Sequence, residues 1–407
     1  MRNITGNNAL GNDFFDRKRE IARYWDKLET DNLLLLAPRR VGKTSIMKTM
    51  ASDASRHGFA AVYVDVSDSE SELRFVQKVW SSLLSDCHDV AAQDQLSGWL
   101  KNSWAADLVK TFKKAGGYGF SIEIDAGQAS WQQVGEEVSG LLGRVDARCL
   151  IFIDELPVFV LKLLGDGSKA GVDRVHQFLY WIRTIRQKFP IRWMLAGSVG
   201  LDTVAARINV ADAINDLHIE KLDGFSHEIA DEFLQALAAS YGMTLGPDVR
   251  NRVLERVGSD RPIPYYLQLI FDQLRQIGGE PVMGDVESAV ENLLRPAHKN
   301  YFDYWRQRLF EELGRPDAEA AILLLNRCCY APGGELRGTL SLSLAGAIAE
   351  TDQRENKLRF LLDVLQNDGY LIESERERWS FYSPLLRAFW MKRIAPPPAS
   401  GKPAGER

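Results

Sequence analysis

Short apolar runs alternate with helical patterns along the first half of the chain. The runs occupy residues 33–36, 60–66, 150–153 and 192–196, and a weaker one follows at 218–222. Runs of this length with few polar interruptions are typical of strands buried on both faces of a sheet. Because strands that alternate with helices form covered parallel sheets, we expect an α/β domain with a parallel sheet.

The hydrophobic period changes after Gly224. Apolar side chains recur every four residues from Ile229 to Tyr241, which is a helical spacing. Ser226 precedes this pattern and is a plausible N-cap. We therefore predict an all-helical domain over residues 224–300.

A third unit is predicted over residues 301–394. Residues 353–366 have the pattern of a helix, whereas 370–372 and 379–381 look like the two strands of a hairpin. A last helix is expected after Pro384. Helices followed by a hairpin and a further helix resemble a winged helix.

These patterns predict a sheet domain over residues 13–223 and a disordered, proline-rich tail over 395–407. The stretch 86–130 fits the sheet domain poorly, so we expect an insertion there. Alternating apolar and polar positions from Tyr118 onward predict a small hairpin within this insertion.

Composition narrows the possible functions. The chain has 407 residues, enough for two or three domains, and 45% hydrophobic and 26% charged residues indicate a soluble globular protein. A net charge of -5 gives no overall attraction to nucleic acid. Neither the four cysteines nor the six histidines have the spacing of a zinc site. No apolar run approaches the ~20 residues that span a bilayer, and no signal peptide is evident, so we expect a cytoplasmic protein without membrane contact.

A phosphate-binding motif follows the first apolar run. Residues 37–44 read Ala-Pro-Arg-Arg-Val-Gly-Lys-Thr, which matches the P-loop pattern G-x-x-x-x-G-K-[ST] except at Ala37, and 46–57 predicts the helix that should follow. Gly42 permits the turn that aims backbone N–H groups at phosphates, and the helix N-terminus favours their negative charge. We expect Lys43 to contact the β- and γ-phosphates of ATP and Thr44 to bind magnesium (Mg²⁺).

Two acids end the third apolar run. Asp154 is expected to hold the magnesium, and Glu155 to orient or deprotonate the attacking water. Ser198 ends the fourth run, which we expect to lie beside the P-loop strand, so its hydroxyl is a candidate sensor of the γ-phosphate. These features predict an ATPase.

Several segments together resemble the archaeal-type ATPase family, in the STAND branch of P-loop proteins near the AAA+ group. Besides the P-loop, the similarity rests on residues 14–20, 152–157, 197–201, 263–268 and 381–387, in the order that the family has them. Residues 14–20 resemble its G-R-x-x-E box, with Asp16 where glycine is usual, and 381–387 resemble its winged-helix closing motif. The resemblance covers about residues 13–394.

The resemblance implies a nucleotide-driven switch with ATP bound between a sheet domain and a helical lid. It places Asp16 and Arg17 near the adenine and Pro264 where the lid meets the nucleotide. The complete set of predicted nucleotide-binding residues is Asp16, Arg17, Pro38, Arg39, Arg40, Val41, Gly42, Lys43, Thr44, Ser45 and Pro264. From the residues themselves, one of Arg39, Arg40, Arg183 and Arg186 could serve as an arginine finger, and the alternative for each is a solvated surface arginine.

Three functions remain open at this stage: a regulatory ATPase switch, a DNA-binding protein controlled by ATP, and a nucleotide-binding scaffold with negligible turnover. Residues 317–394 contain ten basic and eleven acidic residues. Because DNA contacts need unopposed cations, we expect this region to pack on the ATPase core or on a protein partner, with DNA binding as the alternative. Self-association is a further expectation.

Overall fold

The computed structural model describes residues 1–87, 89–101, 130–165, 167–197, 200–258, 260–374 and 377–397. The chain forms two compact units. The sheet unit comprises Asn8–Ala37 and Gly42–Leu222, and the C-terminal unit comprises Met1–Asn7, Pro38–Val41 and Asp223–Arg407. The hairpin predicted from Tyr118 onward lies outside the described residues, as does the tail from residue 398.

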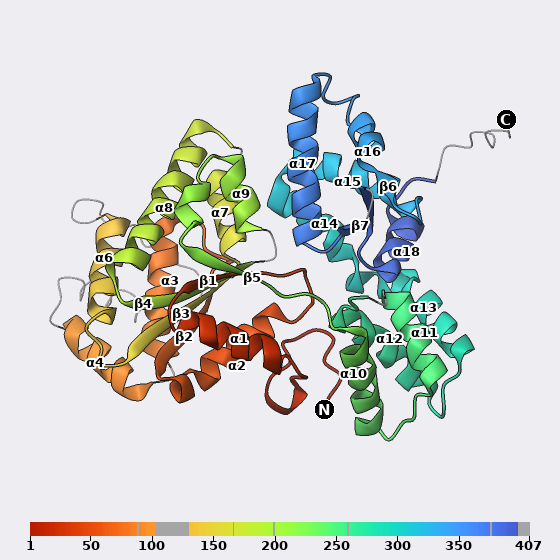
Figure 1. The fold of residues 1–407 in the computed structure, drawn as a ribbon, viewed down its shortest axis with the longest axis horizontal. Coiled ribbons are helices and arrows are strands. Elements are labelled where there is room, and N and C mark those ends of the chain that lie inside the picture. Colours follow the sequence, from red (N-terminus) through yellow and green to blue (C-terminus); the bar gives the residue numbers. More distant parts are fainter. Residues whose placement is uncertain are drawn as a thin grey trace. The chain divides into compact units, whose positions relative to one another are not determined.

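A five-stranded parallel sheet with the order β2-β3-β4-β1-β5 forms the centre of the sheet unit (Figure 1). All five predicted strands are confirmed, and β4 lies beside β1 as expected. The strands are β1 (Asn32–Leu36), β2 (Phe59–Asp65), β3 (Arg148–Asp154), β4 (Ile191–Gly197) and β5 (Leu217–Lys221).

Helices cover both faces of this sheet, with α1 and α2 on one face and α3, α7 and α8 on the other (Figure 1). The α-helices are α1 (Lys18–Leu28), α2 (Lys43–Asp53), α3 (Glu72–Ser85), α4 (Val90–Lys101), α6 (Trp131–Leu142), α7 (Leu156–Leu164), α8 (Lys169–Lys188) and α9 (Leu201–Arg207). Among the described residues of this unit, the short 3₁₀ helices are η1 (Gly11–Asp13), η2 (Ala54–His57) and η3 (Ala211–Ile214).

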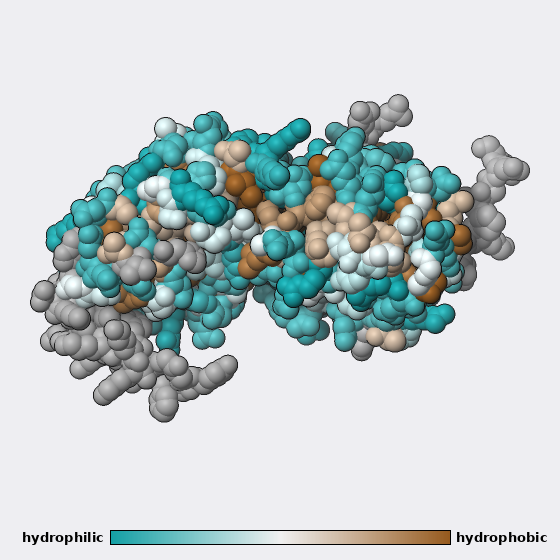
Figure 2. Space-filling model, turned by 90° about the horizontal axis from the view of Figure 1, so that it is seen from below, coloured by the Kyte–Doolittle hydropathy of each residue, from teal (hydrophilic) through white to brown (hydrophobic). Residues whose placement is uncertain are grey.

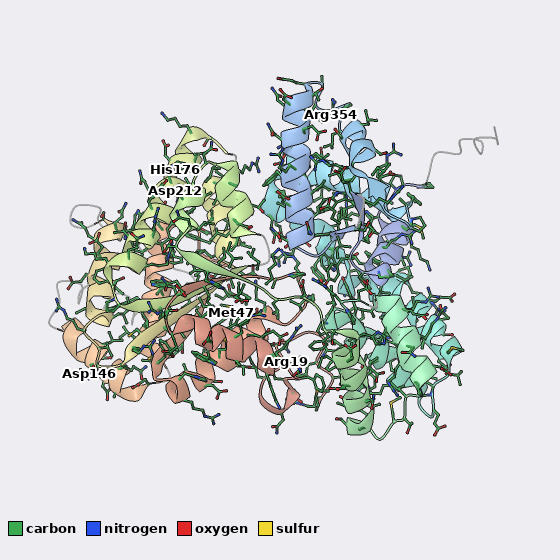
Figure 3. The ribbon with its side chains drawn as sticks, in the orientation of Figure 1. Arg19, Met47, Asp146, His176, Asp212 and Arg354 are labelled. Carbon is green, nitrogen blue, oxygen red and sulfur yellow. The ribbon has the colours of Figure 1, made fainter. Side chains whose placement is uncertain are left out.

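Burial explains why these segments fold as they do. Every residue of β1 is buried, which accounts for its uninterrupted leucines. On the face away from α2, the rings of Phe75, Phe159 and Phe178 lie 5.0–5.3 Å apart and join α3, α7 and α8. Met47 of α2, labelled in Figure 3, is fully buried on the other side. The helix predicted at 46–57 begins three residues earlier, at Lys43, and continues from Asp53 as η2.

The C-terminal unit begins with helices, as the period after Gly224 predicted. Ser226 Oγ accepts a hydrogen bond from the backbone N–H of Ile229, which confirms the N-cap. The helices up to residue 301 are α10 (His227–Ser240), α11 (Pro247–Val257), α12 (Pro264–Ile277), α13 (Met283–Leu293) and the 3₁₀ helix η4 (Pro296–Tyr301).

A small antiparallel sheet with the order β6-β8-β7 follows among further helices. The elements are α14 (Asp303–Leu313), α15 (Arg315–Cys329), β6 (Glu335–Leu336), α16 (Arg337–Ser343), α17 (Thr351–Asn367), β7 (Leu371–Ser374), β8 (Arg378–Phe381) and α18 (Pro384–Arg393). The predicted helix at 353–366, the hairpin and the last helix are therefore confirmed. The boundary between a helical lid and a winged helix at residue 301 stays a prediction.

The face drawn in Figure 2 is mostly hydrophilic, with apolar residues in smaller groups. Within the described ranges, every helix is too short or too polar to cross a lipid bilayer. Exposed apolar side chains nevertheless gather around the turn between α12 and α13, where Ile277, Val282 and Met283 are each at least half exposed.

Candidate functional site

The loop between β1 and α2 has the backbone that a P-loop needs. Gly42 is the N-cap of α2 and has φ +101°, in the left-handed region that glycine adopts without strain. Ala37, which replaces the first glycine of the motif, is not among the described residues with positive φ, so alanine fits there. The first N–H groups of α2 therefore point out of the helix beside Lys43 and Thr44.

Lys43 is buried between the two acids that end β3. Its Nζ lies 3.1 Å from Oδ1 of Asp154 and 3.1 Å from Oε1 of Glu155. Burial alone would lower the pKa of Lys43, but the two carboxylates outweigh it and the pKa is raised. The lysine is thus a fixed positive charge, and the structure brings together three residues that the sequence predicted for one site.

Asp154 is the most heavily bonded side chain of this site. Thr44 Oγ1 donates to its Oδ2 over 2.7 Å, and the hydroxyl of Tyr63 donates to the same oxygen over 2.9 Å. Its Oδ1 accepts from the backbone N–H of Glu155 over 3.0 Å. Only 1% of Asp154 is exposed, so these contacts fix the carboxylate in one orientation.

Sequence reasoning missed Tyr63. In the register of the sheet, Tyr63 of β2 lies opposite Phe152 of β3, and Asp154 is two residues beyond Phe152. Side chains two apart on a strand share a face, so Tyr63 and Asp154 lie on the same side of the sheet. The available signal was a tyrosine among the mostly apolar residues 60–66. Burial, followed by the charge of Asp154, raises the pKa of Tyr63, which keeps its hydroxyl protonated as a donor.

The oxygen donors at this site suit magnesium. Thr44 Oγ1 and Asp154 Oδ2 are hard oxygen ligands that already lie together. Among the described residues, no group of three or more histidine, cysteine or acidic side chains could hold a metal. One carboxylate and one hydroxyl, completed by phosphate oxygens and water, is the arrangement that Mg²⁺ adopts in phosphate-binding sites.

Backbone strain is concentrated at predicted site residues. Of the six described non-glycine residues with positive φ, four are Asp16, Arg17, Arg40 and Glu155. Such conformations cost on the order of 1–3 kcal/mol each and persist where the surroundings enforce them. The value of +54° at Asp16 also explains why a glycine would suit this position.

Each of the other predicted residues has a local setting of its own, and one falls outside the described residues. Arg17 is buried and donates to Glu20 over 2.8 Å in the first turn of α1. Pro264 is the first residue of α12 in the C-terminal unit, and Ser45 is buried in the first turn of α2. Ser198 falls outside the described residues, so its predicted sensor role stays a prediction.

Two of the candidate arginine fingers have structural partners within the sheet unit. Arg186 donates to both carboxylate oxygens of Asp216, over 2.9 and 2.7 Å, and to the carbonyl of Ala213. Arg183 forms an ion pair of 3.6 Å with Asp212. Because the Arg186 side chain is fully buried, we correct its interpretation from catalytic candidate to a residue that holds α8 against η3.

The other two candidates, Arg39 and Arg40, belong to the C-terminal unit together with Pro38 and Val41. Arg39 is buried and pairs with Glu312 and Asp368. The Arg40 guanidinium lies over the rings of Tyr265 and Tyr304, 4.5 and 4.7 Å from their centroids. Sequence patterns did not indicate these partners.

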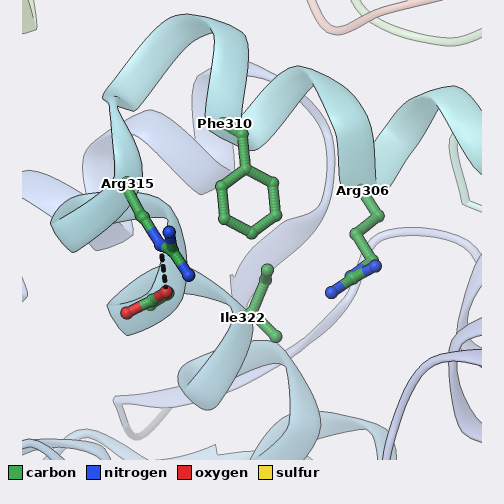
Figure 4. Close-up of a pocket in the computed structure, with 5 residues that line it drawn as sticks. Arg306, Phe310, Arg315 and Ile322 are labelled. Carbon is green, nitrogen blue, oxygen red and sulfur yellow. Dashed lines mark hydrogen bonds and ion pairs between the residues drawn. The ribbon is translucent and has the colours of Figure 1, made fainter.

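The C-terminal unit contains a pocket that none of these residues lines. It has a volume of about 430 Å³ and lies between α14 and α15, where Arg306, Phe310 and Ile322 line it together with an Arg315–Glu319 ion pair of 3.0 Å (Figure 4). None of the predicted site residues lines it, so it does not change the assignment of the site.

Comparison with known proteins identifies the fold of the chain. No family model and no curated protein matches the sequence. The structure is similar to that of the Walker-type ATPase PABY2304 of Pyrococcus abyssi, with a TM-score of 0.61 and 16% identity over 96% of this chain and 99% of that chain. The chain has the fold of a P-loop ATPase. At this identity the similarity extends to the fold alone.

Lower similarity is found to two other proteins. The ORC2 protein of Aeropyrum pernix gives a TM-score of 0.46 at 11% identity, over 95% of this chain and 97% of that chain. The RuvB Holliday junction branch migration motor of Thermotoga maritima gives 0.40 at 13% identity, over 91% and 93%.

Proposed function

We propose that this protein binds ATP with magnesium and hydrolyses it slowly as a regulatory switch of the archaeal-type ATPase kind. The observation that carries the proposal is the convergence of Lys43, Thr44, Asp154 and Glu155 at the carboxyl ends of β1 and β3. In a parallel sheet this edge is where ligands bind.

Each residue has a task that its geometry supports. Lys43 carries a fixed charge for the β- and γ-phosphates, and Thr44 and Asp154 supply oxygens that would hold Mg²⁺. When bound, the metal neutralises charge on the phosphate oxygens. Asp154 is already oriented by Tyr63, so the metal ligand needs no rearrangement.

Glu155 is placed to act on water. Its carboxylate is partly exposed and lies next to Lys43, whereas that of Asp154 is buried. We infer that Glu155 takes a proton from water as the water oxygen forms a bond to the γ-phosphorus and the bridging P–O bond breaks, which leaves ADP and phosphate. A glutamate at this position favours hydrolysis over phosphoryl transfer to a second substrate.

The DNA-binding alternative is less well supported. The order of the last helices and the hairpin is compatible with a winged helix. However, two basic residues of α17 already form hydrogen bonds within the protein. Lys357 donates to Asp317 over 2.6 Å, and Arg354, labelled in Figure 3, donates to the carbonyls of Ile348 and Ala349. Phosphate contacts would have to replace these bonds. The exposed apolar turn between α12 and α13 instead favours a protein partner or self-association.

The test is release of phosphate from ATP by the whole chain in magnesium. We expect measurable turnover that falls about 10²-fold in Glu155→Gln, while binding of a fluorescent ATP analogue survives. Unchanged turnover in this variant would place the base elsewhere. The same assay with duplex DNA discriminates the alternative, because a DNA-controlled ATPase should be stimulated and the proposed switch should not.

A further inference from the structure

Arg39 lies in the middle of the phosphate loop and is bound by two buried acids of the C-terminal unit. Its Nη2 donates to Oε1 of Glu312 on α14, and its Nε lies 3.2 Å from Oδ1 of Asp368, just after α17. The backbone N–H of Arg39 also donates to the carbonyl of Asp368 over 3.3 Å. Both the side chain and the main chain of this loop residue are therefore held.

The charges around Arg39 balance one another. Arg308 also donates to Glu312, over 2.9 Å, so the Arg39 cluster contains Arg39, Arg308, Glu312 and Asp368. Asp368 is 0% exposed, and among the described residues neither of its carboxylate oxygens accepts a well-aligned hydrogen bond. Since a buried carboxylate without donors is costly, Asp368 depends on the charge of Arg39.

Neighbouring residues hold the same stretch of loop. The Arg40 guanidinium contacts the rings of Tyr265 and Tyr304, and its Nε donates to the Tyr304 hydroxyl over 3.1 Å. Gly369 has φ +81°, and a Cβ at this position would lie 2.8 Å from Cβ of Pro38. The chain after α17 thus approaches the loop as closely as its backbone permits.

We propose that Glu312 and Asp368 compete with the phosphates of ATP for Arg39, so that nucleotide binding breaks the ion pairs of the Arg39 cluster. The inference rests on the proposed function and specifies its regulation. Arg39 lies only four residues before Lys43, and its charge is neutralised by the two acids as long as the Arg39 cluster is intact. Glu312 and Asp368 act through Arg39 and are positioning residues.

Competition predicts the direction in which ATP affinity changes when the acids are altered. Weakening the acids removes part of what holds Arg39 away from phosphate and removes negative charge near the loop, so ATP should bind more tightly. Coupling of this kind is typically 5- to 150-fold. If the acids merely shaped the loop for phosphate, the same variants would bind ATP more weakly.

The experiment measures affinity for a fluorescent ATP analogue with magnesium, using the whole chain. We expect Glu312→Gln to bind about fivefold or more tightly than wild type. The matched control is Glu311→Gln, which removes the same charge from an exposed position one residue away on α14 and should bind as wild type does. If Glu312→Gln unfolds at a much lower temperature than wild type, Asp368→Asn serves as the second variant, and it too should bind ATP more tightly than wild type.

Hydrogen exchange supplies a readout that does not depend on turnover. ATP should increase exchange in residues 365–371 of wild type, and these residues should exchange rapidly in Glu312→Gln with or without ATP. The inference would be overturned if both acid variants bind ATP as wild type does or more weakly, or if ATP does not change exchange in this segment. In either case, ATP binding that depends on Lys43 would still support the proposed function. Wild type that binds no ATP would overturn both.

Discussion

The hydroxyl of Tyr63 donates a hydrogen bond to Oδ2 of Asp154 over 2.9 Å, from the neighbouring strand of the sheet. Thr44 donates to the same oxygen, so this tyrosine and the predicted metal-binding threonine together set the direction of one carboxylate. Groups that orient a metal ligand in this way contribute to metal affinity without touching the metal.

Tyr63→Phe should therefore raise the magnesium concentration needed for half-maximal turnover by about 10-fold or more, the usual range for such partners. The measurement is a magnesium titration of phosphate release. Tyr180→Phe is the matched control, because Tyr180 also donates to a carboxylate, that of Asp212, but at an exposed position on α8. An unchanged magnesium requirement in Tyr63→Phe would show that Thr44 alone suffices.

Lys43→Ala should weaken ATP binding at least about tenfold, since a buried positive charge for the phosphates is lost. The measurement is titration of a fluorescent ATP analogue. Arg56→Ala removes an exposed positive charge in η2, beyond the far end of α2, and should leave affinity unchanged. Equal binding by Lys43→Ala and wild type would refute the P-loop assignment.

Asp154→Asn should impair ATP binding by about tenfold or more in magnesium and leave it unaffected in EDTA, because the carboxylate acts through the metal. Asp65→Asn, at the position that pairs with Asp154 across β2 and β3, serves as the control and should bind normally in both conditions. A defect that persists undiminished in EDTA would instead assign Asp154 a structural role through Lys43 and Tyr63.

The Arg39 cluster predicts a pH dependence of stability. Burial raises the pKa of Asp368 to about 7, while Arg39 and Arg308 lower it and Glu312 raises it. A carboxyl whose folded pKa exceeds its unfolded value near 3.9 stabilises the fold at low pH and loses that contribution as pH rises through about 7. Tyr304 and Tyr370 also face this cluster and carry raised pKa values of their own, so they stay neutral in this range.

The melting temperature of Asp368→Asn minus that of wild type should therefore become more positive between pH 5 and pH 8, since asparagine cannot ionise. The measurement is thermal melting of both chains at several pH values. Asp352→Asn, on the exposed face of the first turn of α17, should show a constant difference. If the difference in melting temperature between Asp368→Asn and wild type does not change with pH, Arg39 keeps this carboxylate ionised over the whole range from pH 5 to pH 8.

Local signals in the sequence determined the sheet unit and the centre of the candidate site. Uninterrupted apolar runs such as Leu33–Leu36 have no stable place except between two helical layers, so their strands could be predicted one at a time. The spacing around Gly42 and Lys43 encodes a turn and a helix start within a few residues. The acids that meet Lys43 were predictable because strands of a parallel sheet end at a common edge.

Only the tertiary structure decided which distant residues meet. Tyr63 reaches Asp154 across 91 residues of sequence, and Glu312 reaches Arg39 across 273. Sequence patterns report burial and local conformation, whereas an ion pair depends on register and on which helix covers which segment. Arg39 and Arg186 were therefore both candidate arginine fingers in the sequence, and the structure shows each of them buried beside different acids.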